Sequence, residues 1–293
     1  MNGSVEQLVK PAGEDVQEPV LYEKRGAVAI ITLNRPRYAN AQNDHMTYEL
    51  DRAFLRAGND DEVGAIVLRG EGKHFSSGHD LGTPSTGFVA TDEDRISPWY
   101  SPANKQGGER MYSREQEVYL GMCRRWRDLP KPTIAAVQGG CIAGGLMLAW
   151  VCDIIIASED AYFTDPVVNM GVPGVEYFAH AFEMPNRIAR EFLMLGEKMT
   201  AERAREHGMV NHVVPRAELF DHAFAMAEKL ASRPRFALAL TKQAFNLVDD
   251  AQGKRTAMEG VFAMHHLAHA HNQIVSGGGI QGQTVASMKA NIG

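Results

Sequence analysis

Apolar and polar positions alternate along the first seventy residues in a way that predicts strands, a helix and another strand. Two β-rich runs, 20–25 and 27–33, surround Gly26 and predict a hairpin. A polar break at 34–36 ends the second strand, and Asn43 is the predicted N-cap of a helix that reaches about residue 57. The apolar run 63–69 predicts the next strand, and a glycine-rich loop follows at 70–82.

The stretch 131–153 combines a buried strand, two glycine pairs and an apolar helix. Residues 133–137 predict the strand, glycines follow at 139–140 and 144–145, and residues 146–151 predict the helix. The first turn of a helix has backbone N–H groups without internal acceptors, and glycine lets a ligand approach them closely. The stretch therefore predicts a ligand-binding turn, with a glycine turn that serves packing alone as the alternative.

Residues 83–109 are rich in Pro, Gly, Ser and Asp, with Trp99 and Tyr100 in the middle. A loop of this length predicts a lid or an insertion. Helical periodicity returns at 111–128, and short strands are predicted at 153–157 and 161–164.

The last third of the chain is helical in pattern. Thr200 is the predicted cap of a helix at 201–207, and further helices are predicted at 217–232, 236–248, 255–273 and 281–290. The chain is thus expected to have an α/β fold. We divide it into a mobile tail (1–18), a core (19–215, with the insertion 83–109) and a C-terminal helical region (216–293).

Composition narrows the function classes. Hydrophobic residues make up 44% and charged residues 23%, with a formal net charge of -6. These values are ordinary for a soluble globular protein and argue against a nucleic-acid partner. The absence of a leader pattern and of a long apolar run predicts a cytoplasmic protein without a membrane partner. Three cysteines without CxxC spacing are predicted to be reduced core residues.

Generic cofactor motifs are not present. The glycines at 139–145 do not fit G-x-G-x-x-G, and there is no P-loop or G-x-S-x-G sequence. A histidine group, His265, His266, His269 and His271, contains pairs spaced i, i+4, which is a zinc-binding pattern on a helix. Because no acidic partner lies at a known spacing, we predict no metal site.

Four segments give the chain a strong resemblance to one known family. They are RPRYANAQN (35–43), HFSSGHDL (74–81), AAVQGGCIAGG (135–145) and MTAERAREHGMVNHVVP (199–215). In this order and spacing the chain resembles the crotonase family, also called the enoyl-CoA hydratase/isomerase family, from about residue 20 to residue 216.

The resemblance implies a fold of repeated ββα units with a C-terminal α-helical trimerisation region. It also implies a homotrimer or a dimer of trimers, a coenzyme A thioester as substrate and no permanently bound cofactor. At the matching positions, the backbone N–H groups of His79 and Gly144 form an oxyanion hole for the thioester oxygen. The His79 imidazole either takes part in the reaction or has no role, in which case only the backbone N–H of His79 contributes.

The resemblance further implies a binding surface for coenzyme A. The matching residues are Arg35, Arg37, Tyr38, Ala39, Ala41, Ser77, Asp80 and Leu81. In the insertion, Trp99 and Tyr100 are predicted to cover the acyl pocket. Arg35 and Asp80 have structural alternatives, since either side chain can instead hold its loop together.

The sequence departs from the family at the two positions that hold the attacking water in hydratases. There the family has glutamates, whereas this chain has Met147 and Val167. Neither side chain transfers protons, so hydration by the standard glutamate pair is in doubt.

Glu176 is the candidate replacement. Isomerases and a dehalogenase of the family use a carboxylate in this loop, and Glu176 lies one residue beyond the aligned position, Val175. Burial beside Tyr177 would raise the pKa of the Glu176 carboxyl. The alternative is that Glu176 caps the following helix. Asp165 and His180 are further candidates.

The predicted function is therefore an enzyme that stabilises an acyl-CoA enolate and moves a proton, by isomerisation or atypical hydration. One alternative is a non-catalytic acyl-CoA-binding protein, which Met147 and Val167 favour. Another is a decarboxylase, dehalogenase or C–C lyase that uses the same enolate.

Overall fold

The computed structural model describes residues 18–81, 88, 90–91, 94–97, 99–277 and 281. The predicted tail, apart from Glu18, and the predicted helix 281–290, apart from Gln281, lie outside these residues. Part of the predicted insertion 83–109 also lies outside them.

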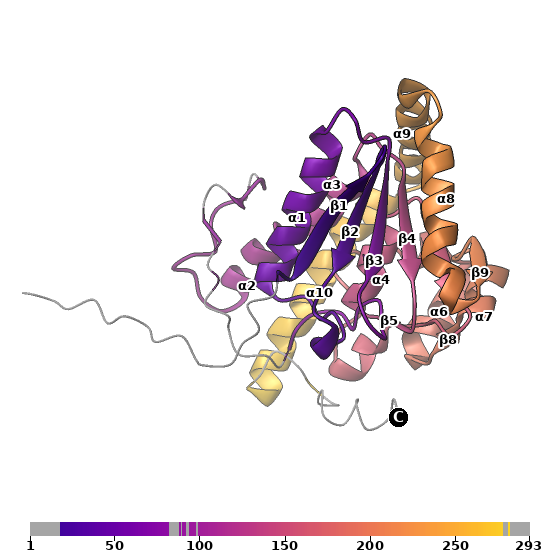
Figure 1. The fold of residues 1–293 in the computed structure, drawn as a ribbon. Helices are drawn as coiled ribbons and strands as arrows, with labels where there is room; N and C mark the ends of the chain where they lie inside the picture. The colour runs from indigo at the N-terminus through magenta and orange to yellow at the C-terminus, as the bar shows by residue number, and fades with distance from the viewer. Residues whose placement is uncertain are drawn as a thin grey trace, which may run out of the picture.

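A six-stranded sheet forms the centre of the molecule (Figure 1). Its order is β1-β2-β3-β4-β6-β9; β1 and β2 are antiparallel and the remaining pairs are parallel. The strands are β1 (Val20–Arg25), β2 (Val28–Leu33), β3 (Ala65–Gly70), β4 (Thr133–Val137), β6 (Ile154–Ser158) and β9 (His212–Val214). The predicted hairpin and the next two strands are confirmed within two residues, whereas β9 was not predicted.

Helices cover both faces of this sheet, as burial of a parallel sheet requires. Alternate strand residues face opposite ways, so Val28 and Ile30 pack with Ala223 and Ala227 of α8 (Leu219–Ala231). Ala29 and Ile31 belong to the larger core on the other face, which includes residues of α1 (Asp44–Asn59), α3 (Leu120–Arg127) and α4 (Gly144–Trp150).

A small second sheet lies beside the glycine pairs. It joins β5 (Gly140–Ile142), β7 (Tyr162–Thr164) and β8 (Met199–Thr200), with β5 parallel to β7. The predicted glycine turn therefore contains a short strand, because Gly140, Cys141 and Ile142 pair with 162–164. Helix α4 begins at Gly144, two residues before its predicted start.

The helix predicted at 111–128 is interrupted. The structure has α2 (Gly107–Glu115) and α3, separated by a tight turn at Tyr119. Tyr119 has φ 65° and ψ -82°, and the Leu120 N–H donates to the Val118 carbonyl at 2.9 Å. This is a γ-turn with positive φ, a strained conformation for a residue with a bulky side chain.

Short helices lie between and after the last two strands of the second sheet. They are α5 (His180–Glu183), α6 (Asn186–Leu195) and α7 (Ala201–Glu206); α5 and α6 were not predicted. The predicted caps are confirmed: Asn43 accepts from the Met46 N–H, and Thr200 accepts from the Arg203 N–H. The chain also forms the 3₁₀ turns η1 (Pro36–Tyr38), η3 (Pro166–Met170) and η4 (Arg216–Glu218).

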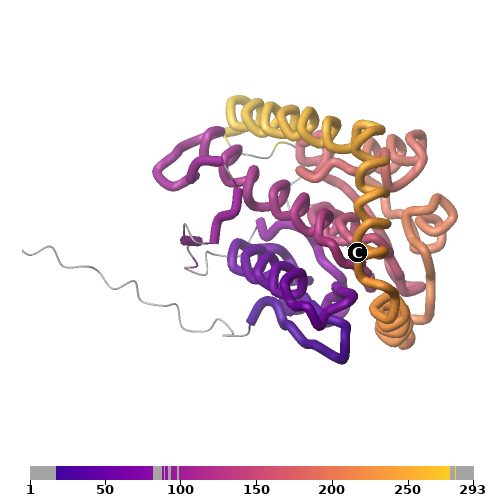
Figure 2. Tube along the Cα trace, turned by 90° about the horizontal axis from the view of Figure 1, so that it is seen from above, coloured from indigo at the N-terminus to yellow at the C-terminus, as the bar shows by residue number. Residues whose placement is uncertain are grey.

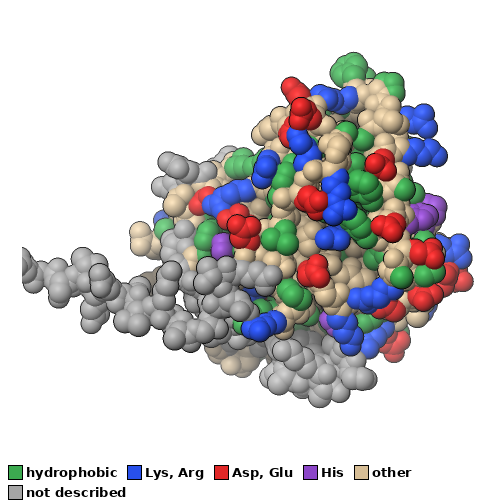
Figure 3. Space-filling view, in the orientation of Figure 1, with side chains coloured by type: hydrophobic (Ala, Val, Ile, Leu, Met, Phe, Trp, Pro, Cys, Tyr) green, Lys and Arg blue, Asp and Glu red, His purple; other side chains and the backbone are tan. Residues whose placement is uncertain are grey.

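The C-terminal part of the described chain is helical, as predicted, with α8, α9 (Arg235–Ala251) and α10 (Lys254–Ser276). Figure 2 shows α10 running along one side of the molecule, next to α2. None of the described helices is long and apolar enough to cross a membrane. The face in Figure 3 carries basic and acidic side chains interspersed, with no field of one sign.

Candidate active site

Two loops meet at the carboxyl ends of β3 and β4, where open α/β sheets usually bind ligands. Ser76 pairs with Cys141 in a parallel bridge, which holds the 71–81 loop against the glycine stretch. A side chain on Gly78, which has φ +90°, would come within 2.9 Å of the Gly144 nitrogen. The loops therefore approach each other so closely that only glycine fits at position 78.

The backbone N–H groups of His79 and Gly144 lie together at this meeting point. A Cβ on Gly144 would be 3.3 Å from the His79 nitrogen. Neither N–H donates a hydrogen bond to another residue of the described chain. Ala143, which precedes Gly144, has φ 46°, a strained conformation for alanine. Strained residues of this kind typically cluster at functional sites. The two N–H groups thus have the arrangement that an oxyanion hole needs.

The His79 imidazole also belongs to the site. It packs against Gly144, stacks on the Tyr119 ring at 3.7 Å, and places Nε2 3.6 Å from Glu176 Oε2. Burial lowers the pKa of His79 to about 3, so the ring is neutral at physiological pH. The strained turn therefore positions the Tyr119 ring against one face of this imidazole.

Glu176 is buried, with a side-chain exposure of 3%. Burial, and after it the negative charge of Glu115, raises the pKa of Glu176 well above its ordinary value. The alternative role as a helix cap is wrong, because the N-cap of α5 is Ala179 and no side chain caps it. The aligned residue, Val175, is part of the hydrophobic core.

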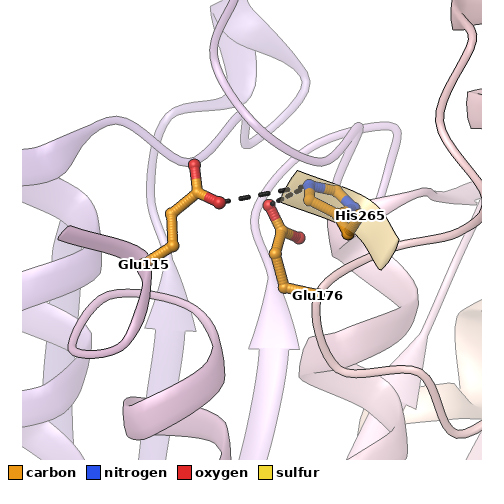
Figure 4. Close-up of side chains that lie close together, drawn as sticks. All are labelled: Glu115, Glu176 and His265. Atoms are coloured by element: carbon orange, nitrogen blue, oxygen red, sulfur yellow. Dashed lines mark ion pairs between the residues drawn. The ribbon is translucent and has the colours of Figure 1, made fainter. Parts of the chain in front are cut away.

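Two further groups approach Glu176 from distant parts of the chain (Figure 4). His265 of α10 places Nε2 3.6 Å from Glu176 Oε1 and 4.0 Å from Glu115 Oε2, at the end of α2. His265 Nδ1 lies 2.8 Å from the Gly174 carbonyl. Because a carbonyl only accepts, Nδ1 carries the proton and Nε2 faces the carboxyl groups.

The charges in this cluster differ from group to group. Burial alone would raise the pKa of Glu115, but a hydrogen bond from His266 and the positive charge of Arg114 lower it. Burial lowers the pKa of His265 to about 4. The sequence has no acidic partner at a known spacing, but in the fold Glu115 and Glu176, from other parts of the chain, both face the histidine group.

One ligand atom each from Glu115, Glu176 and His265 lies within 4.8 Å of the others. Carboxylates and a neutral imidazole are metal ligands, so the cluster has the chemistry of a divalent-cation site. Zinc bonds of 2.0–2.2 Å in tetrahedral geometry bring ligand atoms to about 3.4 Å from one another. The cluster is wider than this and would have to contract to hold zinc.

Asp165 and His180 form a separate buried pair, with His180 Nε2 2.8 Å from Asp165 Oδ2. Trp150 and Phe178 pack against the His180 ring. An aromatic enclosure of this kind indicates a structural pair.

The residues predicted to bind coenzyme A come together around η1. Arg35 forms a partly buried ion pair with Asp80 at 2.9 Å and also donates to the Ala41 carbonyl. The Ser77 N–H donates to the Ala39 carbonyl at 2.9 Å. The structural alternatives for Arg35 and Asp80 thus match their contacts, whereas Arg37, Tyr38 and Leu81 are exposed.

Trp99 lies at the other end of the site. Its ring stacks on Tyr100 at 5.4 Å and contacts Tyr112 of α2 at 5.6 Å. Tyr112 in turn contacts His266 at 4.8 Å. Trp99 is therefore connected to the Glu115 end of the cluster.

Comparisons with known proteins agree with this geometry. A family model described as enoyl-CoA hydratase/isomerase matches residues 23–98 and 103–281. The chain belongs to the enoyl-CoA hydratase/isomerase family. It is 40% identical over 263 residues to the Mycobacterium tuberculosis protein named "Putative enoyl-CoA hydratase EchA13", covering 89% of this chain and 83% of that protein.

Solved structures show the same relationship. A probable enoyl-CoA hydratase from Mycobacterium smegmatis superposes with a TM-score of 0.82 at 43% identity, covering 91% of this chain and all of the other. One from Mycobacterium thermoresistibile gives a TM-score of 0.82 at 45% identity over 90% of this chain and all of the other. The crotonase fold and an enzyme of hydratase/isomerase type are therefore confirmed, and the non-catalytic alternative is not favoured.

The two positions at which hydratases of the family are expected to have glutamates carry no acidic or basic side chain in this chain. Met147 is fully buried in α4, and Val167 packs against the core from η3. Sequence reasoning missed Glu115, His265 and Tyr119 as members of the site. The i, i+4 histidines were a signal, but their acidic partners lie on elements far away in sequence.

Proposed function

We propose that the protein acts on the acyl group of a coenzyme A thioester by stabilising its enolate. In this proposal the thioester oxygen accepts hydrogen bonds from the N–H groups of His79 and Gly144. Removing one such donor typically costs about 3–4 kcal/mol in the transition state. Support comes from the two free N–H groups, which lie together at the carboxyl ends of the strands.

Glu176 is the proposed proton-transfer group for isomerisation or atypical hydration. The observation that carries this is its position: Glu176 Oε2 is 3.6 Å from the His79 imidazole, whose ring lies against Gly144. Burial raises the pKa of this carboxyl, which favours the protonated form that donates a proton to a carbon next to the thioester.

The coenzyme A part of the substrate is proposed to lie along η1 and the 77–81 loop. The exposed Arg37 and Tyr38 would meet its phosphates and adenine, and Leu81 its pantetheine arm. Arg35, Asp80, Ala39, Ala41 and Ser77 would hold the loop in shape. Coenzyme A enters as part of the substrate, so no permanently bound cofactor is needed.

The assembly is proposed to be a homotrimer or a dimer of trimers. Large apolar side chains are exposed on α9 and α10: Phe236, Leu240, Phe245, Leu247, Val248, Met264, Leu267, Ile274 and Val275. Exposed apolar surface of this extent is typical of a subunit interface.

Turnover by wild type and Glu176→Gln tests the proposal. Crotonyl-CoA and longer 2- and 3-enoyl-CoAs serve as substrates, and Glu206→Gln, exposed at the end of α7, is the matched control. We expect Glu176→Gln to lower kcat roughly 10²–10⁴-fold, as loss of an acid/base group does. Equal turnover by both variants would remove Glu176 from the mechanism, and binding of acyl-CoAs without any turnover by wild type would favour a binding protein.

A further inference from the structure

Glu115 is a buried carboxylate that the proposed function does not yet use. It is the last residue of α2, with a side-chain exposure of 9%. His266 Nε2 lies 3.3 Å from Glu115 Oε2 and His265 Nε2 lies 4.0 Å from it. Glu176 Oε2 lacks a hydrogen-bond partner within the described chain, whereas His266 is the neighbour of Glu115 Oε2. Two carboxyl groups thus share one buried site.

One imidazole, that of His265, lies close to both carboxyl groups. Figure 4 shows Glu115 and Glu176 pointing at His265 from different elements. His265 is fixed by its bond to the Gly174 carbonyl, so Nε2 has a defined direction. His269 Nε2 lies 3.0 Å from that same nitrogen, one helical turn along α10. The pair is therefore preorganised, with an ordered imidazole beside both of its members.

We infer that Glu115 is the second catalytic carboxylate of this site and that, with Glu176, it adds water across the double bond of a 2-enoyl thioester. This inference rests on the proposed function and specifies its reaction. The pair would take the place of the absent acid and base at Met147 and Val167, using different elements of the fold.

The roles follow from the surroundings of each group. Glu115 lies 3.3 Å from His266 and 3.9 Å from Arg114, which favour its ionised form. Burial and the negative charge of Glu115 favour the protonated form of Glu176. Two titratable groups pushed apart in this way are a base and an acid.

The step balances as the addition of one water. Glu115 takes a proton from water, and the water oxygen forms a bond to the β carbon of the substrate. The electron pair of the double bond moves toward the thioester oxygen, which His79 and Gly144 bind through their N–H groups. Glu176 then gives its proton to the α carbon. The proton that Glu115 took then moves to Glu176, whose carboxylate lies within 4.8 Å of Glu115, and both groups return to their starting forms.

Isomerisation needs a single carboxylate to shift a proton, whereas hydration needs one group to deprotonate water and another to protonate carbon. Only hydration should therefore depend on both carboxyl groups. The test compares wild type, Glu115→Gln and the matched control Glu109→Gln, which lies on the exposed side of α2. Each is assayed for hydration of crotonyl-CoA and, in deuterium oxide, for exchange of the α protons of butyryl-CoA.

We expect Glu115→Gln to hydrate crotonyl-CoA roughly 10²–10⁴-fold more slowly. It should still exchange α protons, because loss of the negative charge of Glu115 lowers the pKa of Glu176 and so favours the ionised form that takes the α proton. Glu109→Gln should match wild type in both assays. Hydration at the wild-type rate by Glu115→Gln would overturn the inference and leave the proposed function standing. If wild type neither hydrates nor exchanges, the proposed function itself fails.

Thermal unfolding of each variant separates chemistry from folding. Should Glu115→Gln fail to fold, Glu115→Asp keeps the charge but withdraws it by one methylene. Its kcat is then expected to fall about tenfold or more with little change in KM, and an unchanged kcat would overturn the inference. Loss of wild-type hydration in EDTA, restored by Zn²⁺, would also overturn it, because the cluster would then act as a metal site.

Discussion

Gly144 illustrates how tightly single residues are constrained at this site. A Cβ there would lie 2.6 Å from Cδ2 and Nε2 of the His79 ring. Gly144→Ala keeps the N–H but must displace the imidazole that connects the oxyanion hole to Glu176. We expect kcat to fall roughly 100-fold or more, in line with loss of an oxyanion donor or a misplaced group.

The matched control for this change is Gly108→Ala. Gly108 lies in the first turn of α2, and a Cβ there meets no atom within 4 Å. Steady-state kinetics of both variants decide the matter. Equal kcat values would show that the contact between Gly144 and His79 has no part in catalysis.

The raised pKa of Glu176 predicts a dependence of stability on pH. Between the ordinary value of 4.5 and the raised folded value, the folded protein binds more protons than the unfolded chain. The free energy of unfolding therefore falls as pH rises through this window. Glu176→Gln removes the titrating group, so the Tm of the variant minus the Tm of wild type should increase from pH 4.5 upward. A Tm difference that stays constant with pH would contradict the assignment.

At the scale of elements, a buried carboxylate connects α3 to the insertion. Glu117 accepts from the N–H groups of Ile96 and Ser97 at 3.0 and 2.6 Å, and from Arg125 at 3.1 Å. Arg125 in turn pairs with Asp51 of α1 at 2.9 Å. One side chain thus ties the segment before Trp99 to the helical layer.

We expect Glu117→Ala to lower the free energy of unfolding by about 3 kcal/mol, because it leaves buried donors without an acceptor. Trypsin should also cut faster at Arg95, beside the released segment. Glu62→Ala, which removes an exposed pair with Lys24, should cost less than about 1 kcal/mol. Urea unfolding measures both, and equal losses would contradict the role of burial.

Most elements of the core could be predicted because their signals are local. Apolar runs such as 63–69 and caps such as Asn43 and Thr200 depend on neighbours in sequence. The break between α2 and α3 could not, because its positive φ falls on Tyr119, a residue without turn preference. Strand β9 was not predicted because its residues are partly exposed at the edge of the sheet, and its pairing with β6 is not a local signal.

At the scale of the whole molecule, the apolar faces of α9 and α10 predict self-association. Leu267 and Phe245 are 70% exposed in the single chain. We expect Leu267→Glu and Phe245→Glu to shift the protein to a smaller species in light scattering coupled to size exclusion. Leu21→Glu, on the edge strand β1, is the control and should leave the mass unchanged. A wild type that already runs as a monomer would contradict the proposed trimer.

The candidate site could be predicted only in part, because some of its residues are far apart in the sequence. The glycine stretch and the 74–81 loop carry recognisable motifs, so the expected pair of N–H groups at His79 and Gly144 followed from sequence. The neighbours of Glu176 come from α2 and α10, which are far from it in the chain. Only the folded structure brings such groups together, and no local pattern marks them.

The turn at Tyr119 has a consequence for engineering. Its positive φ costs free energy of order 1–3 kcal/mol, and that cost is borne by the residue whose ring supports His79. Glycine at position 119 relieves the backbone but removes the ring. A screen that rewards heat resistance alone will therefore favour variants here that survive longer and catalyse less, so selection must include turnover from the first round.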